Sequence, residues 1–128
     1  MDFPIHLYIP RIRRGNIKDV IKAKWSIVTK TWTINYNHSK AKELWWRYGH
    51  PSNAKMRSNE FPGYLYININ EIEEATLLGD IFYDVNSNLF CAYQDDPNFE
   101  RVFSKYGNPF RNRIELCSMK EFPRLAKN

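Results

Sequence analysis

Cysteine is scarce in this 128-residue sequence, which has two, Cys91 and Cys117. Two cysteines are too few for a disulfide framework, and neither a Cys-x-x-Cys pair nor a His/Cys cluster predicts a zinc site. We therefore expect two reduced thiols that fill small buried positions.

Long apolar runs are also missing. No run reaches the length of a membrane-spanning helix, so no membrane partner is expected. Residues 1–4 are not a basic region followed by an apolar stretch, so they predict no secretory signal. The expected location is the cytoplasm.

Motifs of enzyme active sites are absent as well. The sequence has no glycine-rich phosphate loop, nucleophile elbow or metal-ligand spacing, so we expect no enzyme, no cofactor and no bound metal. His6, His38 and His50 are scattered. His38 and His50 flank a predicted helix and could form an acid-base pair for metal-independent RNA cleavage, but structural or surface roles are favoured.

Aromatic residues, by contrast, make up 16% of the chain. Such residues can supply a large core to a small domain, or exposed faces on which bases or a protein partner stack.

An internal repeat organises the sequence, because a shift of 58 positions aligns it with itself without a gap. The identical matches are Phe3-Pro4 with Phe61-Pro62, Leu7-Tyr8-Ile9 with Leu65-Tyr66-Ile67, Tyr48-Gly49 with Tyr106-Gly107, and Pro51 with Pro109. We predict a tandem duplication, with a first unit over residues 1–58, a second unit over 59–116 and a tail over 117–128. Residues 121–123 resemble the start of a third copy. The two units could form one compact body or two closely linked ones.

Each unit predicts the order β-α-β-β-α, which is an α+β fold with mainly antiparallel strands. A strand opens each unit, a short helix follows, and a hairpin comes next. The predicted opening strands are His6–Ile9 and Gly63–Ile69, the helices Ile17–Lys24 and Glu71–Leu78, and the hairpin strands Ala23–Ile27, Thr31–Tyr36, Ile81–Val85 and Leu89–Tyr93.

A second helix closes each unit and ends at a glycine. Asp96 and Pro97 suit the N-cap and the first helical position of the second closing helix. The expected apolar faces are Ala41, Leu44, Trp45 and Tyr48 in the first unit and Phe99, Val102, Phe103 and Tyr106 in the second. The polar stretch Ser52–Glu60 is the expected linker.

The first unit contains Leu7-Tyr8-Ile9-Pro10, a predicted helix, Ala23-Lys24-Trp25 and then Lys30-Thr31-Trp32-Thr33-Ile34. This pattern resembles a small domain of unknown function found in mobile-element primases, relaxases and phage proteins, and it is more distantly similar to the HARP domain of annealing helicases. The second unit resembles a diverged copy, with Leu78-Gly79, Tyr83-Asp84 and Phe90. The resemblance implies a link to DNA processing and a phage or mobile-element origin, and it implies no catalytic residues.

Charge is divided between the units. Residues 1–58 hold twelve Lys or Arg and three Asp or Glu, which gives a net charge of +9. Residues 59–116 hold four Lys or Arg and ten Asp or Glu, which gives −6. The tail adds +2, so the net charge of the chain is +5. The fold does not require the cations of the first unit, because the second unit lacks them. Such a cluster attracts phosphate, unless it only balances or docks against the acidic unit.

The candidate nucleic-acid-binding residues combine this cluster with a second contact. They are Arg11, Arg13, Arg14, Lys18, Lys22 and Lys24, with Lys42, Trp46 and Arg47 as the second contact. Trp46 lies off the apolar face, so it could stack on a base or pack against the linker or the other unit. Trp25 and Trp32 match Tyr83 and Phe90 in the repeat, which favours core packing for both.

The expected function is that of a non-enzymatic accessory protein that binds DNA or RNA with little sequence specificity. The alternative is a protein-interaction factor or inhibitor that binds a host enzyme through its acidic unit or exposed aromatic residues. The candidate partner-binding residues are Glu71, Glu73, Glu74, Asp80 and Asp84, although solvated surface charge is the commoner role for such residues.

Overall fold

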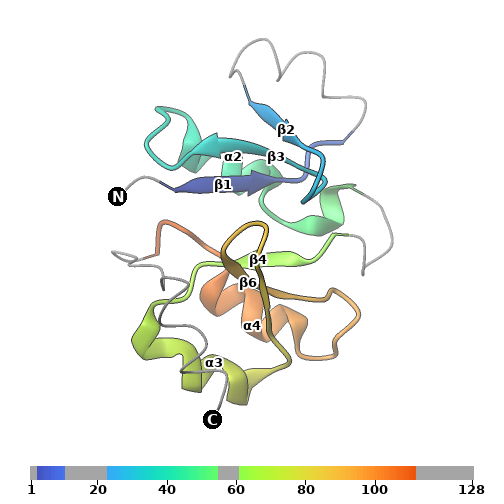
Figure 1. Ribbon diagram of the computed structural model, residues 1–128, viewed down its shortest axis with the longest axis vertical. Coiled ribbons are helices and arrows are strands. Elements are labelled where there is room, and N and C mark those ends of the chain that lie inside the picture. The colour runs from blue at the N-terminus through green and yellow to red at the C-terminus, as the bar shows by residue number, and fades with distance from the viewer. Residues whose placement is uncertain (1–2, 11–22, 55–60, 112–128) are drawn as a thin grey trace.

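The computed structural model describes residues 3–10, 23–54 and 61–111, and these residues form an α+β fold (Figure 1). Their strands make two three-stranded antiparallel sheets, one from each unit. The strands are β1 (Pro4–Leu7), β2 (Lys24–Ser26) and β3 (Thr31–Asn35) in the first unit, and β4 (Gly63–Leu65), β5 (Phe82–Asp84) and β6 (Leu89–Ala92) in the second. The predicted fold class and strand direction are confirmed.

The sheet order is β1-β3-β2 in the first unit and β4-β6-β5 in the second. In each, the opening strand pairs with the second strand of the hairpin. The hairpin turns bring Lys30 and Asn88 to φ values of 56° and 57°. Asparagine tolerates this left-handed conformation better than lysine does.

The closing helices α2 (Ala41–Tyr48) and α4 (Phe99–Tyr106) pack against β1 and β4, respectively. The predicted apolar face of α4 is buried throughout, whereas Trp45 and Tyr48 of α2 are only half-buried. Gly49 and Gly107 end the helices, as predicted. The second unit also contains α3 (Ile72–Leu78), a helix that follows a 3-10 turn at Ile69–Glu71 and packs on α4.

The two units keep the offset of 58 residues in three dimensions. Leu7 pairs with Trp32, and Leu65 pairs with Phe90 in the equivalent register. After each opening strand the chain bonds to the end of the closing helix. The bonds, each 2.7 Å long, join Tyr8 N to Tyr48 O and Tyr66 N to Tyr106 O. This is a likeness of structure, and an origin by duplication stays a prediction.

Side chains of β1 alternate between two cores. Ile5 and Leu7 pack with the helix of their own unit, whereas Tyr8, just beyond the strand, joins a cluster shared with the second unit. In β4, Leu65 packs toward α4 and Tyr64 toward the first unit. Figure 1 shows β1 and β4 as the neighbouring strands of the two halves. Because adjacent residues of a strand point to opposite faces, one strand serves both cores.

The contacts between the units are mainly aromatic, and they are reciprocal. Where a residue of the first unit contacts a residue of the second, the two equivalent residues, with the units exchanged, often contact each other as well. Phe3 contacts Tyr66, and the equivalent Phe61 contacts Tyr8. Two further pairs join equivalent positions to each other. They are His6 with Tyr64, at a ring-centroid distance of 4.1 Å, and Trp45 with Phe103, at 6.5 Å. Reciprocal contact of this kind is the pattern of a twofold interface. Much of the aromatic excess is therefore used in packing between the units.

The opening strands differ from their predicted bounds. Both end earlier than predicted, at Leu7 and Leu65, because the next residue in each, Tyr8 or Tyr66, donates its N–H to a closing helix and leaves the sheet. Lys24, predicted at the end of a helix as well as in a strand, lies in β2.

The predicted start of α4 is wrong by two residues. The helix begins at Phe99, not at Pro97. Asp96 closes a turn before the helix, because its Oδ1 accepts the N–H of Asn98 at 2.8 Å and its carbonyl accepts the N–H of Phe99 at 2.9 Å. Within the predicted linker, residues 52–54 belong to a 3-10 turn, Pro51–Ala54.

Several predictions fall outside the described residues. They concern most of the first short helix, the rest of the linker, Cys117 and the tail over residues 117–128. Cys91 is described, and it is buried with a free thiol, as predicted.

The shared aromatic cluster predicts that the two units unfold together. All four tryptophans lie in the first unit, so their fluorescence reports on that unit. Leu65→Ala empties a fully buried site in the second unit and should lower the free energy of unfolding by about 2–5 kcal/mol. We expect the urea midpoints from tryptophan fluorescence and from circular dichroism to fall together.

Leu77→Ala is the matched control for this change, because Leu77 belongs to the same unit but is 87% exposed, and it should leave both midpoints unchanged. A Leu65→Ala protein whose fluorescence midpoint stays at the wild-type value would contradict coupled unfolding.

Candidate nucleic-acid interface

The basic residues proposed from the sequence are described only in part. Arg11, Arg13, Arg14, Lys18 and Lys22 lie outside the described residues. The structure places Lys24 on β2, and it places Lys42, Trp46 and Arg47 together on α2. All four of these placed side chains are exposed.

Lys24 lies on an edge strand opposite Thr33 of β3. Residues that pair directly across an antiparallel ladder point to the same face of the sheet. The Thr33 hydroxyl also donates to the Lys24 carbonyl at 3.3 Å. Lys24 therefore shares a face with Thr33, a face that carries polar side chains.

The two tryptophans of the hairpin have different environments. Trp32 is buried in the core of the first unit, as predicted. Trp25 is 41% exposed, so the prediction that it packs inside the core is wrong in part. Its ring packs on Trp32 at a centroid distance of 5.4 Å, and it lies on the edge strand of its sheet.

The outer face of α2 combines an indole with cations. Trp46 is 67% exposed, and its ring meets only the edge of Trp45 among the ring contacts of the described residues. Lys42 lies one helical turn before it, at a spacing that makes the two side chains neighbours. Arg47 is 4.0 Å from Glu43, at the outer limit of an ion pair between two exposed groups.

His38 and His50 do not form a catalytic pair. The eight residues of α2 separate them by about 12 Å along the helix axis. The Nδ1 atom of His38 accepts the N–H of Lys40 at 3.0 Å, and the Nδ1 of His50 accepts the N–H of Ser52 at 3.1 Å. Each imidazole therefore holds a local turn beside α2, which is a structural role.

The acidic residues of the second unit are largely engaged within that unit. Glu71 accepts a hydrogen bond from Arg111 at 2.9 Å, which lowers the pKa of its carboxyl group. Glu74 pairs with Lys105, and this bond lowers the pKa of the Glu74 carboxyl group. Asp84 holds its hairpin turn by accepting bonds from Asn86 and Ser87. Glu73 and Asp80 are exposed.

Opposite charge does not join the two units in the part of the chain that the structure describes, apart from His50 and Glu100, whose side chains are 3.0 Å apart. The expectation that basic and acidic units dock through their charges is therefore not met by these residues. Aromatic packing joins the units instead.

Sequence reasoning missed His6, which is only 3% exposed and stacks on Tyr64. Its Nδ1 lies 2.8 Å from the Thr31 hydroxyl, whereas Nε2 has no hydrogen-bond partner among the described residues. Burial lowers the pKa of the imidazole to about 4, opposed by the charge of Asp84. The repeat shows that a tyrosine occupies the equivalent position in the second unit, but it does not show that the imidazole is buried.

Comparison with known proteins adds no assignment. No family model, curated protein or solved structure matches the chain. The resemblance to the small domain of mobile-element proteins stays a prediction.

The described residues lack two further features. None of their helices has the length and apolar character needed to cross a membrane. No three His, Cys, Asp or Glu side chains among them are grouped as they would be around a metal ion.

The buried imidazole predicts loss of stability in acid. Unfolded His6 takes up a proton as the pH falls below about 6.5, whereas folded His6 stays neutral down to a pKa of about 4. The free energy of unfolding should therefore fall by about 3 kcal/mol from this group between those two pH values, at about 1.4 kcal/mol per pH unit. Urea unfolding at a series of pH values measures the loss.

An NMR titration of the imidazole provides the direct check on this prediction. His6 should titrate with a pKa near 4 in the folded protein. A His6 resonance that titrates near the ordinary value of about 6.5 would show that the imidazole is solvated, and the acid sensitivity would then need another cause.

Proposed function

We propose that the protein is a non-enzymatic accessory protein that binds the sugar-phosphate backbone of DNA or RNA through its basic first unit. One observation carries the proposal. Lys24, Lys30, Lys40 and Lys42 are exposed and form no ion pair with the described carboxylates, whereas Glu71 and Glu74 of the second unit pair with cations of their own unit. The first unit thus keeps its positive charge available to phosphate.

Exposed indoles add a second kind of contact. Trp46 beside Lys42 offers a stacking face next to a cation. Trp25 offers part of another, on the face of β2 opposite to that of Lys24. Proteins that bind single strands combine these two features, and each base stacked on an aromatic ring contributes about 1–3 kcal/mol. The combination favours an unpaired strand over a duplex.

Contacts of this kind position a strand without reading its sequence. Binding should therefore be weakly sequence-specific, and it should weaken steeply as salt rises, because each phosphate that a lysine neutralises releases counterions. The resemblance to a domain of mobile-element and phage proteins supports the same direction and a similar origin.

The alternative, a partner-binding acidic surface, has less support in the described residues. Glu71, Glu74 and Asp84 already have hydrogen-bond partners, so only Glu73 and Asp80 of the proposed set remain as exposed carboxylates without an ion pair among those residues. We therefore do not propose this surface as the principal binding site.

Fluorescence anisotropy with a labelled single strand of about 16 nucleotides, made as DNA and as RNA, tests the proposal. Binding should weaken strongly between about 50 and about 200 mM salt. The double change Lys24→Gln and Lys42→Gln should reduce the slope of log affinity against log salt by about 1 for each cation removed. Trp46→Ala should weaken binding about 5- to 100-fold.

Arg101→Gln is the matched control, because Arg101 is an exposed cation of the second unit without an ion pair among the described residues. It should leave binding unchanged. Affinity that does not depend on salt, or a loss in Arg101→Gln equal to the loss in the lysine variants, would reject the proposed interface.

A further inference from the structure

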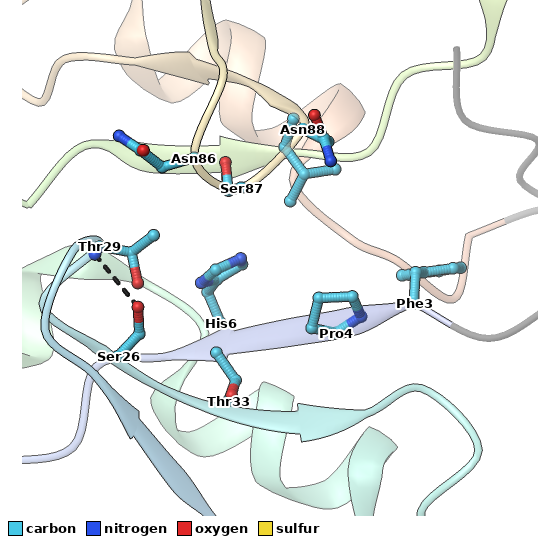
Figure 2. A pocket seen from close by; sticks show the side chains of 10 residues that line it. Phe3, Pro4, His6, Ser26, Thr29, Thr33, Asn86, Ser87 and Asn88 are labelled. Atoms are coloured by element: carbon cyan, nitrogen blue, oxygen red, sulfur yellow. Dashed lines mark hydrogen bonds between the residues drawn. The ribbon is translucent and has the colours of Figure 1, made fainter. Parts of the chain in front are cut away.

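A cleft of about 420 Å³ lies where the two hairpins approach each other over β1 (Figure 2). Its walls come from both units, so neither unit forms it alone. The lining residues are Phe3, Pro4, His6, Ser26, Thr29, Thr33, Asn86, Ser87, Asn88 and Leu89. The volume falls in the range of small-molecule sites.

His6 is the most buried polar residue of the lining. Figure 2 shows its imidazole rising from β1 into the space between the hairpins. Tyr64 covers one face of the ring, and Thr31 fixes Nδ1 at 2.8 Å. Thr29 continues this chain, with its hydroxyl 2.8 Å from that of Thr31. The ring is held in place, and His6 is one of the residues that line the cleft. Its Nε2 atom is buried and has no partner among the described residues.

The fold does not require these polar groups. At the positions equivalent to His6, Thr31 and Thr33, the second unit has Tyr64, Leu89 and Cys91, and all three of those side chains are buried. The same strands therefore form with an apolar face. A buried polar atom without a partner is destabilising, and a ligand that bonds to Nε2 would remove this cost.

The lining also limits the chemistry of that ligand. None of the lining residues carries a formal charge at neutral pH, since the low pKa of His6 keeps its imidazole neutral. A neutral imidazole can donate or accept a hydrogen bond at Nε2, depending on the tautomer. Amide and hydroxyl groups of Asn86, Asn88 and Ser26 offer further donors and acceptors, while Phe3 and Leu89 offer apolar contact. A flat, uncharged ring with a polar edge suits this mixture.

The cation Lys24 lies beside the uncharged cleft. Lys24 shares its sheet face with Thr33, which lines the cleft. A phosphate attached to the ring through a sugar could meet Lys24 while the ring itself occupies the cleft. Asparagine and hydroxyl side chains are common partners of base edges, and proteins that recognise unpaired strands bind bases that are splayed out of the stack.

We propose that the cleft binds one unpaired nucleobase, with His6 Nε2 bonded to its polar edge and Lys24 near its phosphate. This inference deepens the proposed function and rests on it for the source of the base. It assigns recognition of one base to a site made by both units. This site is separate from the exposed indoles that stack on the strand.

Titration of the full-length protein with each of the four common nucleoside 5′-monophosphates tests the inference. NMR of the His6 imidazole nitrogens is the readout. At least one nucleotide should shift Nε2 in a saturable way. Ribose 5-phosphate, which has the phosphate but no base, and glucose, a neutral polar ring, should leave Nε2 unchanged.

Two cleft variants should weaken nucleotide binding, measured by isothermal titration calorimetry, by about tenfold. Thr33→Val removes a hydroxyl of the lining at nearly constant volume, and His6→Tyr introduces the residue that the second unit holds at that position. Thr76→Val is the control, because the exposed Thr76 hydroxyl bonds to the Glu73 carbonyl of α3 and Thr76 is not among the residues that line the cleft.

The inference is overturned if no nucleotide shifts Nε2, or if ribose 5-phosphate or glucose shifts it equally. Its failure is distinguishable from that of the proposed function. Salt-dependent oligonucleotide binding without any nucleotide effect on His6 rejects the cleft and keeps the backbone interface. Nucleotide binding at His6 without oligonucleotide binding supports the cleft and rejects that interface.

Discussion

Aromatic packing between the two units is the interaction on which the rest of the structure depends. Tyr8, Tyr64 and Tyr66 are buried in it, and Tyr66 also accepts the N–H of His6 at 3.3 Å. Large rings bury much apolar surface for each residue, so short strands such as β4, with three residues, can hold a place in the core. The same packing brings the hairpins together and thereby forms the cleft. Without it, neither the buried imidazole nor the lining from two units would exist.

The two units differ most where the shared architecture leaves residues free. The described cations of the first unit are all exposed, and polar groups replace apolar ones on the inner face of its sheet. His6 and Thr31 face the second unit there, although Tyr64 and Leu89 fill the equivalent positions. Each unit thus serves as a reference for the other, because it shows which residues the fold tolerates at a position and which need a separate reason.

The sequence predicted the class, the strand direction and the hairpins, because periodicity and a gapless repeat reflect local geometry. It could not predict where β1 ends or where α4 begins, since Tyr8 donates its N–H to the end of α2 and Asp96 accepts the N–H of Asp80, before β5. The exposure of Trp46 was predictable from its place outside the apolar face of the helix. The environment of His6 was not, because its burial depends on Tyr64 from the other unit.

The reciprocal contacts between the units resemble those of a symmetric homodimer contained in one chain. In a true homodimer every substitution occurs twice, and a residue on the symmetry axis meets a copy of itself. Covalent linkage removes that restriction. Histidine can therefore stack on tyrosine at the axis, where a homodimer would have to stack two histidines or two tyrosines. One chain can therefore build an asymmetric site at its own axis of pseudosymmetry. Identical subunits must contribute the same residues from both sides of such an axis.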